Sequence, residues 1–213
     1  MFKTVKFNGI DSYDDLGLIL TSSNIEAPSP KTNVVEIDGA DGSVDYTEAF
    51  GDVFYENRKL SFDFTYAGSP DSFAEKFSEL QNLLHGEKQK IVISDDPDFW
   101  YFGRVTIDRW KSSKAIRKIT IDCDCEPYKY QNIIRRYEIT SNPQTIKFRN
   151  LRMIVYPKLS ADSAVGISCN GKNVVLSVGT ASQGVIRFTK GENTLVVTGG
   201  SCNLTIESIR GSL

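Results

Sequence analysis

The chain has 213 residues, of which 40% are apolar and 24% charged, and this composition excludes a wholly disordered protein. Its 25 Lys and Arg against 27 Asp and Glu give a formal net charge of −2, which argues against a protein whose main task is to grip nucleic acid. The single histidine, His85, excludes any site that needs two histidines, and no Gly-x-Ser-x-Gly motif supplies a nucleophile. A Ser-His-Asp triad would have to use His85, so a hydrolase is left as the weakest alternative function, and we assign no catalytic, cofactor-binding or metal-binding residues.

The first residues, MFKTVKFNGI, alternate apolar and polar side chains and contain no hydrophobic signal core. No run approaches the roughly 18 apolar residues of a membrane span, so we expect neither an export signal nor membrane insertion. Residues 20–33 are rich in Ser, Thr and Pro and show no periodicity. This segment predicts a long loop or an extended arm.

The segment 35–64 is dense in glycine and aspartate. An EF-hand that starts at Asp41 would have Asp41, Ser43 and Asp45 at alternate positions, but its sixth position holds Tyr46 instead of glycine. The pattern therefore indicates tight turns, in which aspartates bond nearby backbone N–H groups. Arg58 follows at the start of a strand, and we predict that it pairs with Asp41 or Asp45 and pins the turn to a sheet.

Strict alternation of apolar and polar residues predicts two strands, around 60–66 and 119–125. One helix is predicted over about 70–85. Ser69 is its expected N-cap, Pro70 its first helical residue and Gly86 its stop. The apolar residues at helical spacing would pack on a sheet, and they are Phe73, Phe77, Leu80 and Leu84.

The acidic cluster Asp95, Asp96 and Asp98 precedes four aromatic residues. Paired carboxylates beside aromatic rings can form a glycosidase site, but a solvated turn leading into a strand is the favoured interpretation. The four cysteines do not form a Cys-x-x-Cys motif, and we expect them to be reduced, with a Cys169–Cys202 disulfide as the alternative.

A boundary is expected near 127–132, beyond which short strands alternate with turns rich in Gly, Ser and Asn. We therefore predict two domains, 1–130 and 131–213, the second a β-sandwich or jelly roll. Its expected strands lie near 132–140, 145–149, 151–160, 163–169, 173–178, 184–189, 193–198 and 203–209.

The segment 35–64 resembles the hallmark region of the distal tail (Dit) proteins of long-tailed siphophages. The matching positions combine a Gly- and Asp-rich turn with a Tyr and an Arg ahead of an alternating aromatic strand: Gly39, Asp41, Gly42, Asp45, Thr47, Gly51, Tyr55, Arg58, Leu60, Phe62 and Phe64. Gly103 and Arg104 are similar to the family's aromatic-Gly-Arg strand start, and Pro127 and Tyr128 to the Pro-Tyr-x-Tyr end of its first domain. Residues 191–213 resemble the last strands of its galectin-like sandwich.

The resemblance implies a mainly β protein: a β-rich α+β N-terminal domain with one helix that forms a ring, followed by a galectin-like β-sandwich. It also implies a structural role, not that of an enzyme, in the tail tip of a virion assembled in the host cytoplasm. The expected assembly is a homo-hexameric ring that joins the tail tube to the tail-tip hub, with DNA passing through its lumen as cargo. In some phages of the family, receptor-binding or baseplate proteins are further partners.

The alternative function is a carbohydrate-binding, lectin-like module that acts in host adsorption. It would use exposed aromatic residues such as Trp100 and Trp110 as stacking platforms. The predicted sandwich contains no Trp and only Tyr137 and Tyr156, which makes it a poor platform.

Overall fold

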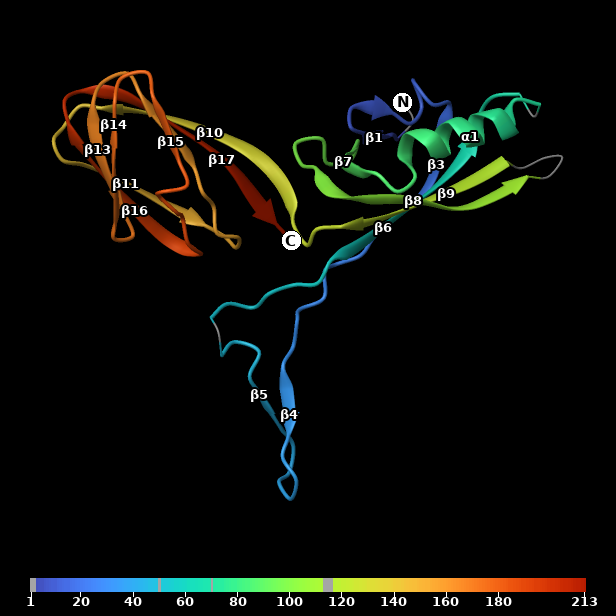
Figure 1. The fold of residues 1–213 in the computed structure, drawn as a ribbon, viewed down its shortest axis with the longest axis horizontal. Helices are drawn as coiled ribbons and strands as arrows, with labels where there is room; N and C mark the ends of the chain where they lie inside the picture. Colours follow the sequence, from blue (N-terminus) through green and yellow to red (C-terminus); the bar gives the residue numbers. More distant parts are fainter. Residues whose placement is uncertain (1–2, 50, 70, 113–116) are drawn as a thin grey trace. The chain divides into compact units, whose positions relative to one another are not determined.

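A computed structural model describes residues 3–49, 51–69, 71–112 and 117–213, without the side chains of residues 109, 110 and 112. The predicted fold class is confirmed: the chain is mainly β, with one α-helix in the described part. It divides into two compact units (Figure 1). Unit 1 runs to Lys129 and includes Leu213, and unit 2 runs from Tyr130 to Ser212.

Unit 1 is built on a seven-stranded antiparallel sheet. From edge to edge the strands are β2 (Ile10–Asp11), β1 (Val5–Phe7), β7 (Lys88–Ile93), β8 (Tyr101–Ser112), β9 (Arg117–Cys125), β6 (Arg58–Tyr66) and β3 (Leu18–Ile25). Alternate residues of β6 and β9 point to the same face, so Phe62 faces Ile121 and Phe64 faces Ile119 in the pairing register. These side chains are fully or almost fully buried and form the centre of the unit 1 core.

The helix α1 spans Phe73–Leu84 and packs on this core through Phe73, Leu80 and Leu84. It begins later than predicted: its N-cap is Ser72 instead of Ser69, and Pro70 lies outside the described residues. The Ser72 hydroxyl donates to the Ser69 carbonyl at 3.0 Å and makes no cap hydrogen bond to the helix. Gly86 follows the helix with a φ of +83°, a conformation that favours glycine, as the predicted stop requires.

Between β3 and β6 the chain forms an arm that we define as residues 26–57. Its outer part is the hairpin of β4 (Val34–Glu36) and β5 (Ser43–Asp45), which forms a separate two-stranded sheet (Figure 1). The predicted loop at 20–33 is therefore half strand, since 20–25 belong to β3, and half arm.

Unit 2 is a β-sandwich of two four-stranded sheets with a shared core. One sheet has the order β10 (Lys129–Ile139), β17 (Cys202–Ser212), β12 (Lys158–Ala161) and β15 (Ala181–Gln183). The other has the order β11 (Gln144–Asn150), β16 (Gly191–Gly199), β13 (Val165–Cys169) and β14 (Lys172–Leu176). Its core includes Ile139 and Ile206 from the first sheet and Ile167 and Leu195 from the second.

Two predicted strands of unit 2 are wrong in extent. The segment 151–160 contributes only β12 at its end, and 184–189 contains no named strand. Val155 and Phe188 instead exchange both backbone hydrogen bonds, at 3.0 and 2.8 Å, in an isolated bridge. Both side chains are buried, so the apolar residues that suggested strands fill the core from irregular backbone.

All four cysteines are free and buried, so the alternative disulfide does not form. Burial raises the pKa of Cys123, with the neighbouring Cys125 and Asp122 adding to the shift. Burial also raises the pKa of Cys125, to about 12. These thiols are therefore protonated, unreactive parts of the core.

Candidate functional site

The outer turn of the arm carries three residues of the predicted motif. Gly39 and Gly42 have φ values of +82° and +77°, which side chains with a Cβ rarely adopt. Asp41 lies between them in this exposed turn. Nothing lies within 4 Å of a Cβ built at either glycine, so backbone conformation, not crowding, requires glycine there.

Asp45 and Thr47 close the base of the hairpin. The Thr47 N–H donates to Asp45 Oδ1 at 2.8 Å, and the Asn33 N–H donates to Thr47 Oγ1 at 3.0 Å. The side-chain and backbone hydrogen bonds of Thr47 hold the pKa of Asp45 below its ordinary value of 3.8. Asp45 is thus a turn-forming carboxylate, as its sequence pattern indicates.

The inner part of the arm is tied to the end of the N-terminal unit by aromatic residues. Tyr55 bridges Pro30 across the two legs, and its ring packs edge-to-face on Tyr128, with ring centroids 6.2 Å apart. A hollow of about 420 Å³ lies here, and its lining includes four predicted motif residues: Thr47, Tyr55, Pro127 and Tyr128. Residues that are distant in sequence are therefore brought together at the root of the arm.

Arg58 does not form the predicted ion pair. In the described residues it contacts neither Asp41 nor Asp45; its Nε donates to the Glu26 carbonyl at 2.9 Å, and its guanidinium lies 5.3 Å from the centre of the Tyr101 ring. The side chain is buried because it lies between the sheet and the first residue of the arm. Its contacts tie the arm to β6 through the backbone, not through an acidic side chain.

Gly103 and Arg104 act inside the sheet of unit 1. A Cβ at Gly103 would lie 2.4 Å from the Asp124 carbonyl oxygen and 2.6 Å from the Cys125 Cα, so only glycine allows β8 to approach β9 here. Arg104 donates to the Gly86 carbonyl, directly after α1. Gly51, the remaining motif glycine, has a φ of +116° in the returning leg of the arm.

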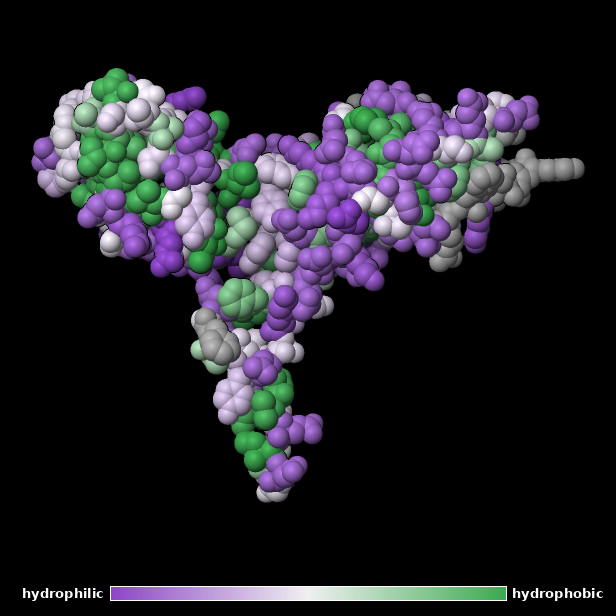
Figure 2. All heavy atoms as spheres, in the orientation of Figure 1, coloured by the Kyte–Doolittle hydropathy of each residue, from purple (hydrophilic) through white to green (hydrophobic). Residues whose placement is uncertain are grey.

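The sequence analysis missed the exposed apolar surface of the arm. Five apolar side chains of the hairpin region are between 39% and 50% exposed, and they are Val34, Val35, Ile37, Val44 and Tyr46. Figure 2 shows apolar side chains along the arm. Residues 34–52 also hold six Asp and Glu and no Lys or Arg. The sequence signal that could have indicated this exposed surface is the presence of apolar residues, without a helical or strand period, in so acidic a segment.

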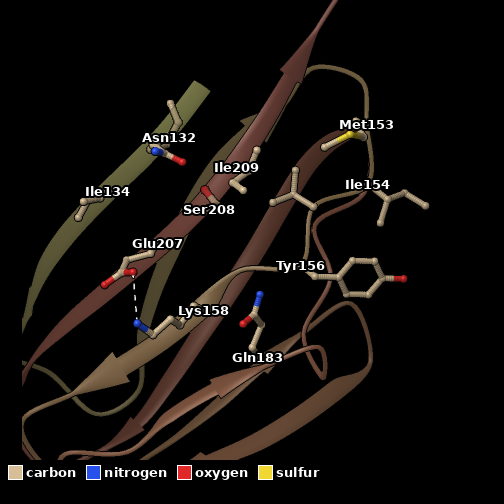
Figure 3. A pocket seen from close by; sticks show the side chains of 12 residues that line it. Asn132, Ile134, Met153, Ile154, Tyr156, Lys158, Gln183, Glu207, Ser208 and Ile209 are labelled. Atoms are coloured by element: carbon tan, nitrogen blue, oxygen red, sulfur yellow. Dashed lines mark hydrogen bonds and ion pairs between the residues drawn. The ribbon is translucent and has the colours of Figure 1, made fainter. Parts of the chain in front are cut away.

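Unit 2 presents a second exposed apolar surface, a hollow of about 540 Å³ (Figure 3). Ile134 and Ile209 come from β10 and β17, while Ile154 and Tyr156 come from the segment before β12, and each is about half exposed. At one side Lys158 pairs with Glu207 at 3.5 Å.

The acidic cluster at 95–98 has a structural explanation. Asp95 pairs with Lys3 at 2.5 Å and Asp96 with Lys129 at 2.6 Å, and these contacts fix a turn before β8. Over the residues that the structure describes, no group of three or more His, Cys, Asp or Glu side chains could hold a metal ion. In the same part of the chain, no helix has the length and apolarity to cross a membrane.

Comparison with known proteins shows that this chain has the fold of a solved structure. No protein-family model and no curated protein matches the sequence. Among solved structures, the chain is similar to the Dit protein (gp19.1) of phage SPP1, described as a paradigm of the hub adsorption apparatus in phages that infect Gram-positive bacteria. The match has a TM-score of 0.71 and 17% sequence identity and covers 100% of both chains. The predicted resemblance to Dit proteins is therefore confirmed at the level of the fold, which this chain shares from end to end.

Proposed function

We propose that this chain is a structural, non-enzymatic subunit of a phage tail tip: a distal tail protein whose copies form a hexameric ring between the tail tube and the hub. DNA would pass through the ring as cargo. The observation that carries this proposal is the full-length fold match to a protein of a phage hub adsorption apparatus. Because proteins of one fold can differ in function, the remaining support must come from the surfaces of this chain.

The arm is the first surface that supports self-assembly. An isolated two-stranded hairpin is marginally stable in water, and this one leaves its apolar side chains exposed. Contact with a second copy would bury them and stabilise the hairpin. In this proposal Asp45, Thr47 and Arg58 hold the arm in shape at its base and root, and the apolar residues make the contact.

The edge of the unit 1 sheet is the second surface. β3 pairs with β6 on one side and ends the sheet on the other, and its residues from Thr21 to Ile25 are exposed. Exposed strand edges offer backbone groups to another chain, and a repeated edge contact between identical subunits forms a ring when the rotation between neighbours closes.

The apolar hollow of unit 2 is the proposed contact for an adjoining tail-tip protein, such as a receptor-binding or baseplate protein. Its lining has one aromatic ring, Tyr156, beside aliphatic side chains and a smaller number of polar ones. Aliphatic surfaces favour a protein partner over a glycan, which stacks on aromatic rings. For the alternative lectin function, Trp100 belongs to unit 1, and the Trp110 side chain lies outside the described residues.

Native mass spectrometry tests the ring. Six copies of the 23.8 kDa chain would give a particle of about 143 kDa. We expect the triple variant Val35→Ser, Val44→Ser and Tyr46→Ser to reduce the hexamer fraction by at least about tenfold, because it removes the apolar contact of the arm.

The matched control replaces Val175 and Val178 of unit 2, which are 79% and 64% exposed, with serine. It should assemble as the unmodified chain does. A chain that stays monomeric at every concentration would contradict the self-assembling ring. A triple variant that assembles normally would contradict the role of the arm.

A further inference from the structure

Charge is divided unevenly between the two units. Residues 1–129 hold 15 Lys and Arg residues and 23 Asp and Glu residues. Residues 130–213 hold 10 Lys and Arg residues and only 4 Asp and Glu residues. The nearly neutral chain thus combines a unit of net charge −8 with a unit of net charge +6. A strongly basic small domain attracts anionic ligands, which the net charge of the whole chain conceals.

Three arginines of unit 2 line one cleft between its sheets. Arg135 comes from β10, Arg149 from β11 and Arg210 from β17, and Ser208 lies two residues before Arg210 on the same side of its strand. No carboxylate belongs to the described lining of this cleft. Clustered guanidinium groups repel one another, and an anion between them would remove that cost.

Arg210 has a buried donor without an acceptor. Its Nη2 donates to Gln131 Oε1 at 3.2 Å, whereas its Nε is buried and has no hydrogen-bond partner among the described residues. This Nε–H group is therefore available to donate to an acceptor that enters the cleft.

The surroundings hold the arginines in place. The Arg135 guanidinium lies 5.4 Å from the centre of the Phe148 ring, and Phe148 packs edge-to-face on Phe188 at 4.4 Å. These rings also lower the local dielectric and strengthen charge interactions. Arg149 is exposed at the rim; Glu192 lies opposite it in the register, but this carboxylate bonds Lys147 at 3.6 Å.

We propose that this cleft binds an oxyanion, a phosphate or carboxylate group, through its arginines. Guanidinium forks match both oxyanions in bidentate geometry. The free volume of about 20 Å³ accommodates about one oxygen atom, so one oxygen of the anion enters while the rest of the group stays at the mouth of the cleft. The inference does not depend on the proposed ring, since it rests on unit 2 alone.

The test measures binding of fluorescently labelled polyphosphate and polyglutamate to the full chain by anisotropy, at a fixed salt concentration of about 0.1 M. The double variant Arg135→Gln and Arg210→Gln should weaken binding by at least about tenfold, because it removes hydrogen bonds to a charged group. The polymer that binds more tightly identifies the oxyanion source.

The control variant Lys172→Gln and Lys190→Gln removes the same charge from unit 2 outside the cleft lining. It should weaken binding by less than about threefold, through long-range attraction only. If circular dichroism shows that the double variant is unfolded, the exposed single variant Arg149→Gln decides, and it should also weaken binding. Equal losses in the cleft and control variants, an unchanged Arg149→Gln, or no binding of either polymer would each overturn the proposal.

Discussion

At the scale of single residues, the motif shared with distal tail proteins is explained by backbone geometry. Gly39 and Gly42 supply positive φ angles, and Gly103 supplies space. Arg58 donates to the main-chain carbonyl of Glu26, where the arm leaves the sheet, and Arg104 donates to that of Gly86, directly after α1. These residues fix how the chain turns and packs. The exposed apolar side chains of the hairpin are the ones that the proposed contact with a second copy would use.

Gly103→Ala should destabilise unit 1 by about 1–3 kcal/mol, because the added methyl group would overlap the backbone of β9. Denaturant unfolding of the variant measures this loss. Gly200→Ala is the control, since nothing lies within 4 Å of its Cβ position and its φ is not in the positive region. Equal stability of the Gly103 variant and the unmodified chain would contradict the close approach of β8 and β9.

At the scale of elements, the hairpin of β4 and β5 adds no side chain to either hydrophobic core. The helix α1 and the strands of unit 1 are fixed by buried side chains, whereas β4 and β5 are exposed along their whole length. In place of a core, the arm has hydrogen bonds at its base and aromatic packing at its root. Its order should therefore respond to the ionisation of Asp45.

The pKa of Asp45 is lowered by its bonds to Thr47, so its contribution to arm stability is present above the ordinary aspartate pKa. This contribution is lost as the pH falls through the lowered pKa of the folded state. The amide signal of Thr47 in NMR spectra should titrate with a midpoint below 3.8. Asp45→Asn should abolish this titration, and a midpoint above 3.8 would contradict the hydrogen bond.

At the scale of the whole molecule, two separate cores stabilise two units. Leu80 belongs to the first core and Leu204 to the second, and both are fully buried. The units also differ in charge sign: the proposed ring contacts lie in the acidic unit 1, and the proposed oxyanion site lies in the basic unit 2.

Calorimetry should therefore resolve two unfolding transitions. Leu80→Ala should lower the stability of the first unit, and Leu204→Ala that of the second, each by about 2–5 kcal/mol from the lost burial and the cavity left behind. Each variant is the control for the other. A single transition that both substitutions shift equally would show that the units unfold together.

The sequence alone determined the mainly β class, the alternating strands such as Leu60 to Tyr66, and the stop of α1 at Gly86. These features follow from local rules: strand period, helical period and the φ that glycine allows.

The tertiary structure decided which residues contact one another. Arg58 bonds a backbone carbonyl instead of an aspartate, Ser72 instead of Ser69 occupies the N-cap position of α1, and Val155 and Phe188 are buried without forming strands. The arginine cleft is also a product of the fold, because β17 is far from β10 and β11 in the chain and meets them only when the sandwich forms. Side-chain type and spacing report local conformation, whereas a contact depends on which distant segments the sheets bring together.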